Sequence, residues 1–287
     1  MPQTIRNPIE WTGEQIVNAG HAIASAHRTL DHMADTAHSP IPAVRKITIA
    51  DVRESLAKGF DDFEAYRSDV LFVGIIYAAV GLVLARLAFG SDLLPLVFPL
   101  ASGFAIIGPF AAIGLYEMSR RREQGAEVTW ANAFDVFKAP AVGGIAALGV
   151  MLVMLFLAWL AVAWGIYALT LGPAEPTSIG AFAHAVFFTP AGWTLIVAGV
   201  GVGFLFALLA MSISVVAFPL LIDRDVGLDT AIRTSIRAVR ENPVPMAAWG
   251  LVVAASLVLG SIPLFIGLVA VVPILGHATW HLYRRLV

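Results

Sequence analysis

The sequence contains no cysteine. Disulfide bonds, a catalytic thiol and cysteine-ligated metal sites are therefore excluded. It also lacks an HExxH pattern and a glycine-rich phosphate-binding loop, and Ser214 and Thr194 have no neighbouring base in the sequence. Because these patterns supply the nucleophiles, bases and phosphate cradles of common enzymes, we predict that the chain is not an enzyme.

Charged residues are scarce as well. They make up 13% of the 287 residues, whereas 59% are hydrophobic. Soluble domains carry about 25% charged residues, so this chain has too few to cover its surface with water-binding groups. The composition predicts that the surface faces a lipid bilayer. The net charge of −2 gives no reason to expect a nucleic-acid partner.

Residues 1–44 have no apolar run of the kind found in a cleavable signal peptide. We predict a polar, partly disordered cytoplasmic segment here, followed by a membrane domain over residues 45–287. The segment holds four of the seven histidines. Their spacings of six, five and six residues do not place them on one helical face, which argues against a metal site there; they are His21, His27, His32 and His38.

Long apolar runs dominate the rest of the chain. They cover residues 70–89, 93–118, 141–171 and 191–222, and a last run over 246–283 is interrupted by Gly260-Ser-Ile-Pro263. About 20 apolar residues cross the hydrocarbon core as a helix, and the last run is too long for one crossing. The sequence therefore predicts an all-α membrane bundle of six transmembrane helices.

Two of these runs resemble each other. In residues 103–121 and 267–285, a glycine is followed after six residues by proline, after seven more by a large aromatic residue, and after four more by two arginines. This pattern is typical of a kinked helix with an aromatic and basic anchor. We predict kinks at Pro109, Pro219 and Pro273, and anchors at Arg120, Arg121, Arg122, Arg284 and Arg285.

An amphipathic segment precedes each pair of predicted spans. The first begins at the capping pair Thr48 and Asp51, and the others lie near 130–138 and 228–239. We predict that they lie on the membrane surface, because no soluble domain is evident for them to cover. The chain then divides into three parallel repeats, residues 45–121, 122–224 and 225–287, each an amphipathic helix followed by two spans.

The basic residues are distributed on one side of these spans. Of the 18 lysines and arginines, 17 lie in the N-terminal region, the 119–140 and 223–245 loops and the C-terminus, and the last is Arg86. The opposite connections contain none. The positive-inside rule therefore predicts that both termini are cytoplasmic, in the cytoplasmic (inner) membrane of a bacterium.

Several stretches are similar to a known bacterial family. They include SDVLFVGIIY at 68–77, GPFAAIGLYEMSRRRE at 108–123, FPLLIDRDVG at 218–227 and GHATWHLYRR at 276–285. Over about residues 42–287 the chain resembles a family of predicted integral membrane proteins, a domain of unknown function. The resemblance implies a membrane protein without an established activity. Some family members are labelled as related to cytochrome c oxidase subunit I, which would associate them with a respiratory complex.

His277 and His281 are the main candidates for ligand chemistry. They lie four residues apart, and therefore on one helical face, and imidazole is a common haem and metal ligand. Each would need a partner from another helix, for which Glu117 and His184 are the candidates. The alternative is that they form hydrogen bonds within the bundle. We predict no cofactor, with haem at these histidines as the minor alternative.

The acidic residues favour a non-catalytic role. Glu117, Asp135 and Asp223 lie near predicted helix ends beside arginines, where ion pairing explains them, and no carboxylate lies at mid-membrane as ion coupling would need. The main hypothesis is an accessory or assembly partner of a larger membrane complex, possessing a membrane-protein partner. The alternatives are an uncoupled permease or lipid-handling transporter, and a haem-binding membrane protein.

Overall fold

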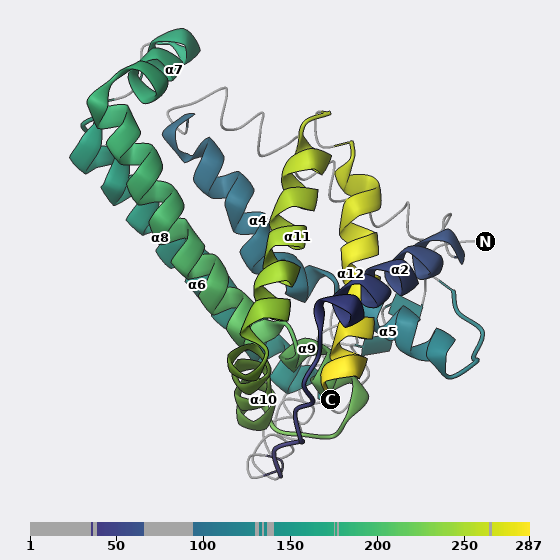
Figure 1. Ribbon diagram of the computed structural model, residues 1–287. Coiled ribbons are helices and arrows are strands. Elements are labelled where there is room, and N and C mark those ends of the chain that lie inside the picture. The colour runs from purple at the N-terminus through teal and green to yellow at the C-terminus, as the bar shows by residue number, and fades with distance from the viewer. Residues whose placement is uncertain are drawn as a thin grey trace, which may run out of the picture.

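Helices form nearly all of the structure. It is a computed structural model, and the residues that it describes contain no β-strand, which confirms the predicted all-α class (Figure 1). The described residues are 36, 39–65, 94–129, 132–133, 135–136, 141–174, 176, 178–263 and 266–287.

The described elements are helical throughout. In chain order they are α2 (Ile49–Ala65), the 3-10 helix η1 (Leu94–Leu96), α4 (Val97–Ala111), α5 (Ile113–Glu123), α6 (Val142–Thr170), α7 (Ile179–Phe188), α8 (Pro190–Ser214), α9 (Ala217–Asp223), α10 (Leu228–Glu241), α11 (Pro243–Ser261) and α12 (Leu268–Leu286).

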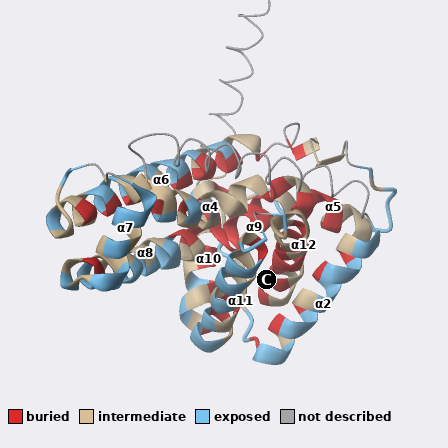
Figure 2. Ribbon diagram, turned by 90° about the horizontal axis from the view of Figure 1, so that it is seen from above, coloured by how far each residue is buried: buried red, intermediate tan, exposed pale blue. Residues whose placement is uncertain are grey.

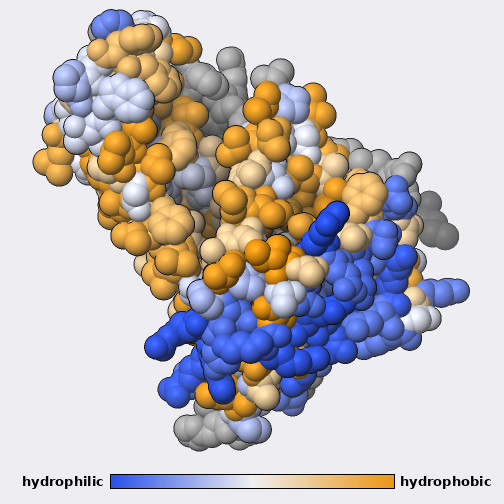
Figure 3. Space-filling view, in the orientation of Figure 1, coloured by the Kyte–Doolittle hydropathy of each residue, from blue (hydrophilic) through white to orange (hydrophobic). Residues whose placement is uncertain are grey.

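The helices form two arms that rise from a common base. Helices α4, α6 and α8 pack together as one arm with α7 at its tip, and α11 and α12 form the other. The base consists of α2, α5, α9, α10 and the end of α12. In the space-filling view the arms are hydrophobic and the base is hydrophilic (Figure 3). This division is that of a protein with its arms in lipid and its base in water.

Three helical segments are long and apolar enough to cross a membrane: Val142–Thr170, Pro190–Asp223 and Pro243–Ser261. A fourth is available if Leu94–Gly103 and Ala105–Ala111, which meet at an angle of 41°, form one bent span. The structure thus supports three or four spans among the described residues, where the sequence predicted six. The predicted span over residues 70–89 lies outside the described residues.

The predicted sixth span corresponds to α12, which is as long as α11 but is not among these segments, because its second half is more polar. Its second half is buried from Leu275 to Trp280 and carries His277, His281 and two arginines that bind residues of the base. These polar groups are placed among protein helices, so the lower end of α12 belongs to the base.

Local signals explain where several helices begin and end. Ser178 caps α7 by accepting a hydrogen bond from the Ala181 amide, and Thr189 caps α8 in the same way with the Gly192 amide. Helix α7 covers the short apolar segment Ile179–Phe188. Asn242 follows the last residue of α10, and Pro243 begins α11.

The core lies mainly in the base, where the largest fully buried side chains gather (Figure 2). They include Trp280, Tyr116, Tyr283, Phe218 and Leu115. On the α6–α8 arm, Trp159 is buried against Phe206 and donates a hydrogen bond to the Pro99 carbonyl, while most outer side chains are exposed. Packing is thus concentrated at the polar end of the molecule.

Helix α2 packs on α12 through one face and leaves other side chains exposed. The packed face consists of Val52, Ser55, Gly59 and Asp62. Ile49 and Phe60 are large apolar side chains that remain exposed. The predicted position of this helix on the membrane surface stays a prediction, in which these exposed apolar side chains would face lipid.

The segment before α2 runs along the end of the last three helices. The Arg45 amide donates to the Leu286 carbonyl at 2.8 Å, and the Ile47 amide donates to Asn242 Oδ1 at 2.8 Å. The Thr230 hydroxyl donates to the Ser39 carbonyl. These contacts join residues that are far apart in sequence. Of the predicted amphipathic segment near 130–138, only residues 132–133 and 135–136 are described, and most of residues 1–44 lie outside the described residues.

Candidate functional site

A buried carboxylate, Asp62, lies where α2 crosses α12. A Cβ atom on Gly59 would lie 2.6 Å from the backbone nitrogen and Cβ of Ala278, so only glycine permits the two backbones to approach this closely. Asp62 follows three residues later on the same helical face and is turned inward, where its side chain is 6% exposed.

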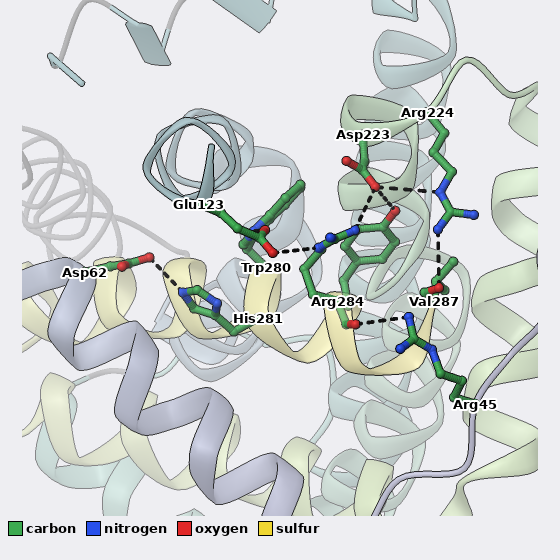
Figure 4. A network of polar contacts seen from close by, with 10 residues as sticks. Arg45, Asp62, Glu123, Asp223, Arg224, Trp280, His281, Arg284 and Val287 are labelled. Carbon is green, nitrogen blue, oxygen red and sulfur yellow. Dashed lines mark hydrogen bonds and ion pairs between the residues drawn. The ribbon is translucent and has the colours of Figure 1, made fainter. Parts of the chain in front are cut away.

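Two other helices supply the partners of Asp62. Arg122 of α5 contacts Oδ1 at 2.6 Å, and the Ser119 hydroxyl donates to Oδ2 at 2.5 Å. From α12, His281 Nε2 lies 2.9 Å from Oδ2, the contact that Figure 4 shows. Burial alone would raise the pKa of Asp62, but hydrogen bonds from His281 and Ser119 outweigh it and hold this pKa below its ordinary value of 3.8. Asp62 therefore links α2, α5 and α12 as a charged carboxylate.

His277 extends this group, which we call the Asp62 cluster: Asp62, Ser119, Arg122, His277 and His281. The His277 ring is fully buried, with Nδ1 2.7 Å from the Ser119 oxygen. Since the single Ser119 proton goes to Asp62, His277 must donate from Nδ1 to that oxygen. Its Nε2 atom has no hydrogen-bond partner among the described residues.

This proton arrangement has a chemical consequence. Serine, histidine and aspartate are the residue types of a hydrolytic triad, but there the serine donates to the histidine and the aspartate orients that histidine. Here Ser119 is fully buried and donates to the aspartate. Ser119 is therefore arranged as a bridge between Asp62 and His277 and not as an activated nucleophile.

A second polar group surrounds Glu117, whose side chain is 4% exposed. Arg120 contacts it through two nitrogens, at 2.7 and 3.0 Å, and Arg121 Nε lies 2.7 Å away. Arg121 also reaches Asp135 at 3.0 Å. Glu117 is thus neutralised by arginines of its own helix, one turn further along.

A third group joins α5, α9 and α12 (Figure 4). The Tyr283 hydroxyl donates to Asp223 at 2.6 Å, and Arg284 lies between Asp223 at 3.5 Å and Glu123 at 3.1 Å. Trp280 Nε1 donates to the same Glu123. The arginine-rich ends of the two similar segments, 103–121 and 267–285, therefore meet at one end of the molecule.

The remaining predicted anchor, Arg285, reaches across to α2. Its guanidinium contacts Asp51 at 3.1 Å and also pairs with Glu54. All five predicted anchor arginines thus make ion pairs with acidic residues of the base: Arg120, Arg121, Arg122, Arg284 and Arg285.

The structure does not join the candidate haem and metal residues as the sequence suggested. Glu117 is occupied by arginines, and His184 lies on α7, at the opposite end from the base, where it stacks on Phe188. In the described part of the chain, no three His, Asp or Glu side chains are grouped to hold a metal ion. His277 and His281 instead share the Asp62 cluster.

Sequence reasoning missed Asp62. One signal was present: Ser55, Gly59 and Asp62 follow at spacings of four and three residues, a small and polar stripe on one face of an otherwise charged helix. Such a stripe permits close helix approach, and it would have identified the face that packs on α12.

The three prolines occupy different settings. Pro109 lies one turn after the 41° bend in the α4 region. Pro219 lies in α9, four residues after Val215, where α8 has ended. Pro273 lies inside α12, which continues without a break from Leu268 to Leu286.

Comparison with known proteins gives one match. No curated protein and no solved structure matches the chain. Residues 97–223, from the start of α4 to the end of α9, match a family model described as "Predicted integral membrane protein (DUF2189)". The match includes Ser119 and Arg122 but not Asp62, His277 or His281. It confirms the predicted resemblance: over this segment the chain is similar to a family of predicted integral membrane proteins whose function is unknown.

Proposed function

We propose that the chain is a non-enzymatic accessory or assembly partner of a larger membrane complex. The observation that carries this proposal is the open flank of the two arms. In the most apolar 18-residue stretch of each helix, 28% of α6 and 22% of α11 is buried. Large side chains such as Met154, Leu157, Leu251 and Leu259 face outward on these helices. The arms are held at the base and offer wide apolar faces to lipid or to neighbouring transmembrane helices.

The polar groups support a structural role. Carboxylates of the base are used in ion pairs, within α5 at Glu117 and between helices at Asp62 and Asp223. Helices α6, α8 and α11 contain no Asp, Glu, Lys or Arg. Ion coupling would need such groups within the spans. Ser119 is not arranged as a nucleophile. We therefore propose neither catalysis nor a cofactor for this chain.

The proposal is tested by isolating the tagged chain, expressed at its native level and extracted in a mild detergent. We expect it in one defined assembly with another membrane protein. Met154→Ala with Leu157→Ala, or Leu251→Ala with Leu259→Ala, should reduce recovery of that assembly and leave the melting temperature of the isolated chain unchanged, because these side chains are exposed.

A buried control separates assembly from folding. Leu152 is fully buried on α6, so Leu152→Ala should lower the melting temperature by an amount that corresponds to about 2–5 kcal/mol. Recovery of the chain as a lone monomer would contradict the proposal. An assembly whose yield is changed neither by Met154→Ala with Leu157→Ala nor by Leu251→Ala with Leu259→Ala would also contradict it.

We further propose six spans with the base in the cytoplasm. The support is that the ends of α5 and α12 and the whole of α10 place their arginines at the base, while residues 171–190 at the α7 end contain no Lys or Arg. The six spans would comprise the described segments, residues 70–89 and α12, in three parallel repeats.

The absence of cysteine allows a direct test of this orientation. Ala57 on α2 and Ala181 on α7 are both exposed, so Ala57→Cys and Ala181→Cys are matched single-thiol variants. In intact cells, an impermeant maleimide should label Ala181→Cys and should reach Ala57→Cys only after the membrane is opened. The reverse order of labelling would contradict the proposed orientation.

A further inference from the structure

An exposed basic group lies at the corner between α10 and α11. Arg237 and Arg240 are three residues apart and lie on the exposed face of α10, and Lys46, from the segment before α2, reaches the end of the same helix. Lys46 Nζ donates to the Glu241 carbonyl at 2.5 Å. We call these three residues the basic corner.

The charges at the basic corner do not balance. Arg237 pairs with Glu241 at 2.5 Å, and Glu241 is the carboxylate that neutralises part of the group. Arg240 makes no ion pair or hydrogen bond with any residue that the structure describes. Among the described residues, these three cations therefore have one neighbouring carboxylate, that of Glu241. Elsewhere on α10, by contrast, Arg233 is balanced one-to-one by Asp229.

An apolar track begins directly after the basic corner. Along α11, exposed large side chains occur at Val244, Leu251, Val258 and Ile262, spaced by seven, seven and four residues. This spacing keeps them on one side of the helix. Val244 lies four residues after Arg240, in the first turn of α11. Figure 3 shows the hydrophilic base directly below the hydrophobic arms.

We propose that the basic corner binds the headgroup phosphate of an anionic phospholipid whose acyl chains lie along the exposed side of α11. Guanidinium groups match the geometry and charge of a phosphate, and basic residues at the end of a span attract anionic lipid. A nucleic acid or an acidic soluble protein would gain nothing from the adjoining apolar track. The inference requires that α11 is in the membrane, but it does not require a protein partner.

The test uses the purified full-length chain in a neutral detergent, with binding of phosphatidylglycerol and phosphatidylcholine measured by native mass spectrometry. We expect preferential binding of phosphatidylglycerol. Arg240→Gln should weaken it about fivefold, and Arg237→Gln with Arg240→Gln about 25-fold, since each basic residue near the headgroups contributes about a factor of five. Added salt should reduce the difference between the two lipids.

The matched control removes the same charge from another exposed surface. Arg53 and Lys58 are exposed on α2, so Arg53→Gln with Lys58→Gln should leave phosphatidylglycerol binding unchanged. Equal loss in both double variants would overturn the proposal, because binding would then follow net charge. Competition by millimolar inorganic phosphate would also overturn it, as it would indicate a site for a free anion.

The single variant keeps the proposal testable if the double variant does not fold, because Arg240 makes no hydrogen bond or ion pair with the described residues and Arg240→Gln removes none. Unchanged binding by a folded Arg240→Gln chain would overturn the proposal. The two proposals can fail separately. A chain that forms the protein assembly but does not prefer phosphatidylglycerol would contradict only the lipid site. A chain that prefers phosphatidylglycerol but is recovered as a lone monomer would contradict only the accessory role.

Discussion

The Asp62→Asn variant is expected to unfold with a free energy about 3 kcal/mol lower than that of the parent chain. Removing one member of a buried ion pair costs about 3–5 kcal/mol, and the lower end applies here because Arg122 is 37% exposed and can be partly hydrated. The amide cannot neutralise Arg122, and its NH2 group cannot accept the hydrogen bonds that both carboxylate oxygens now accept.

Thermal unfolding in detergent measures this loss, with Asp61→Asn as the control. Asp61 is the exposed neighbour of Asp62, so its substitution should change the melting temperature little. An Asp62→Asn chain as stable as the Asp61→Asn chain would contradict the assignment of Asp62 as the link between α2, α5 and α12.

The same variant should also alter the response to acid. Because the pKa of Asp62 is lower in the folded chain than its ordinary value of 3.8, the carboxylate contributes its full stability above about pH 4. That contribution is lost as the pH falls through the folded-state pKa. The difference in stability between the parent chain and Asp62→Asn should therefore be constant near neutral pH and shrink at low pH. A difference that grows as the pH falls would have the wrong sign.

Gly59→Leu is expected to detach α2 from α12. The first added carbon would lie 2.6 Å from the Ala278 backbone, which cannot move aside as a flexible side chain can. Overpacking typically costs about 1–3 kcal/mol and more where backbone must shift, so we expect a loss of about 3 kcal/mol. Leucine is a good helix former, and the loss would therefore report the contact and not helix propensity.

Hydrogen exchange of the backbone amides measures which helices lose protection in this variant. In Gly59→Leu, the amides of Ile49–Ala65 should lose protection while those of α6 and α8 keep theirs. Gly199→Leu and Gly165→Leu are the matched controls, because a Cβ atom at either position meets no atom within 4 Å. If α2 remains as protected in Gly59→Leu as in these controls, the close approach of α2 and α12 is not what holds α2.

The sequence was most informative where the solvent determines the structure. The apolar runs that became α6, α8 and α11 are long enough to be identified individually, and Ser178, Thr189 and Pro243 mark helix starts through local hydrogen bonding and φ restriction. These signals act within one turn or one span. They need no knowledge of which helices become neighbours.

The site could not be predicted in the same way. Asp62 becomes buried only because Gly59 meets Ala278, more than 200 positions along the chain, and its partners come from two further parts of the sequence. His277 and His281 were identified as important by their residue type. Their actual partners, Ser119 and Asp62, depend on how α2 and α5 pack on α12, which hydropathy does not reveal.

The contacts of the base also impose an order of events during synthesis. Ile47 and Asp62 leave the ribosome long before Asn242 and His281, with which they pair. Contacts between such distant residues form late, because the whole intervening chain must first be made. The arm of α4, α6 and α8 can assemble while translation continues, whereas α2 must wait for α12. A chain interrupted before α12 would therefore leave the α12-facing side of α2 uncovered and Asp62 without its contact to His281, a feature by which quality control could distinguish it from the finished protein.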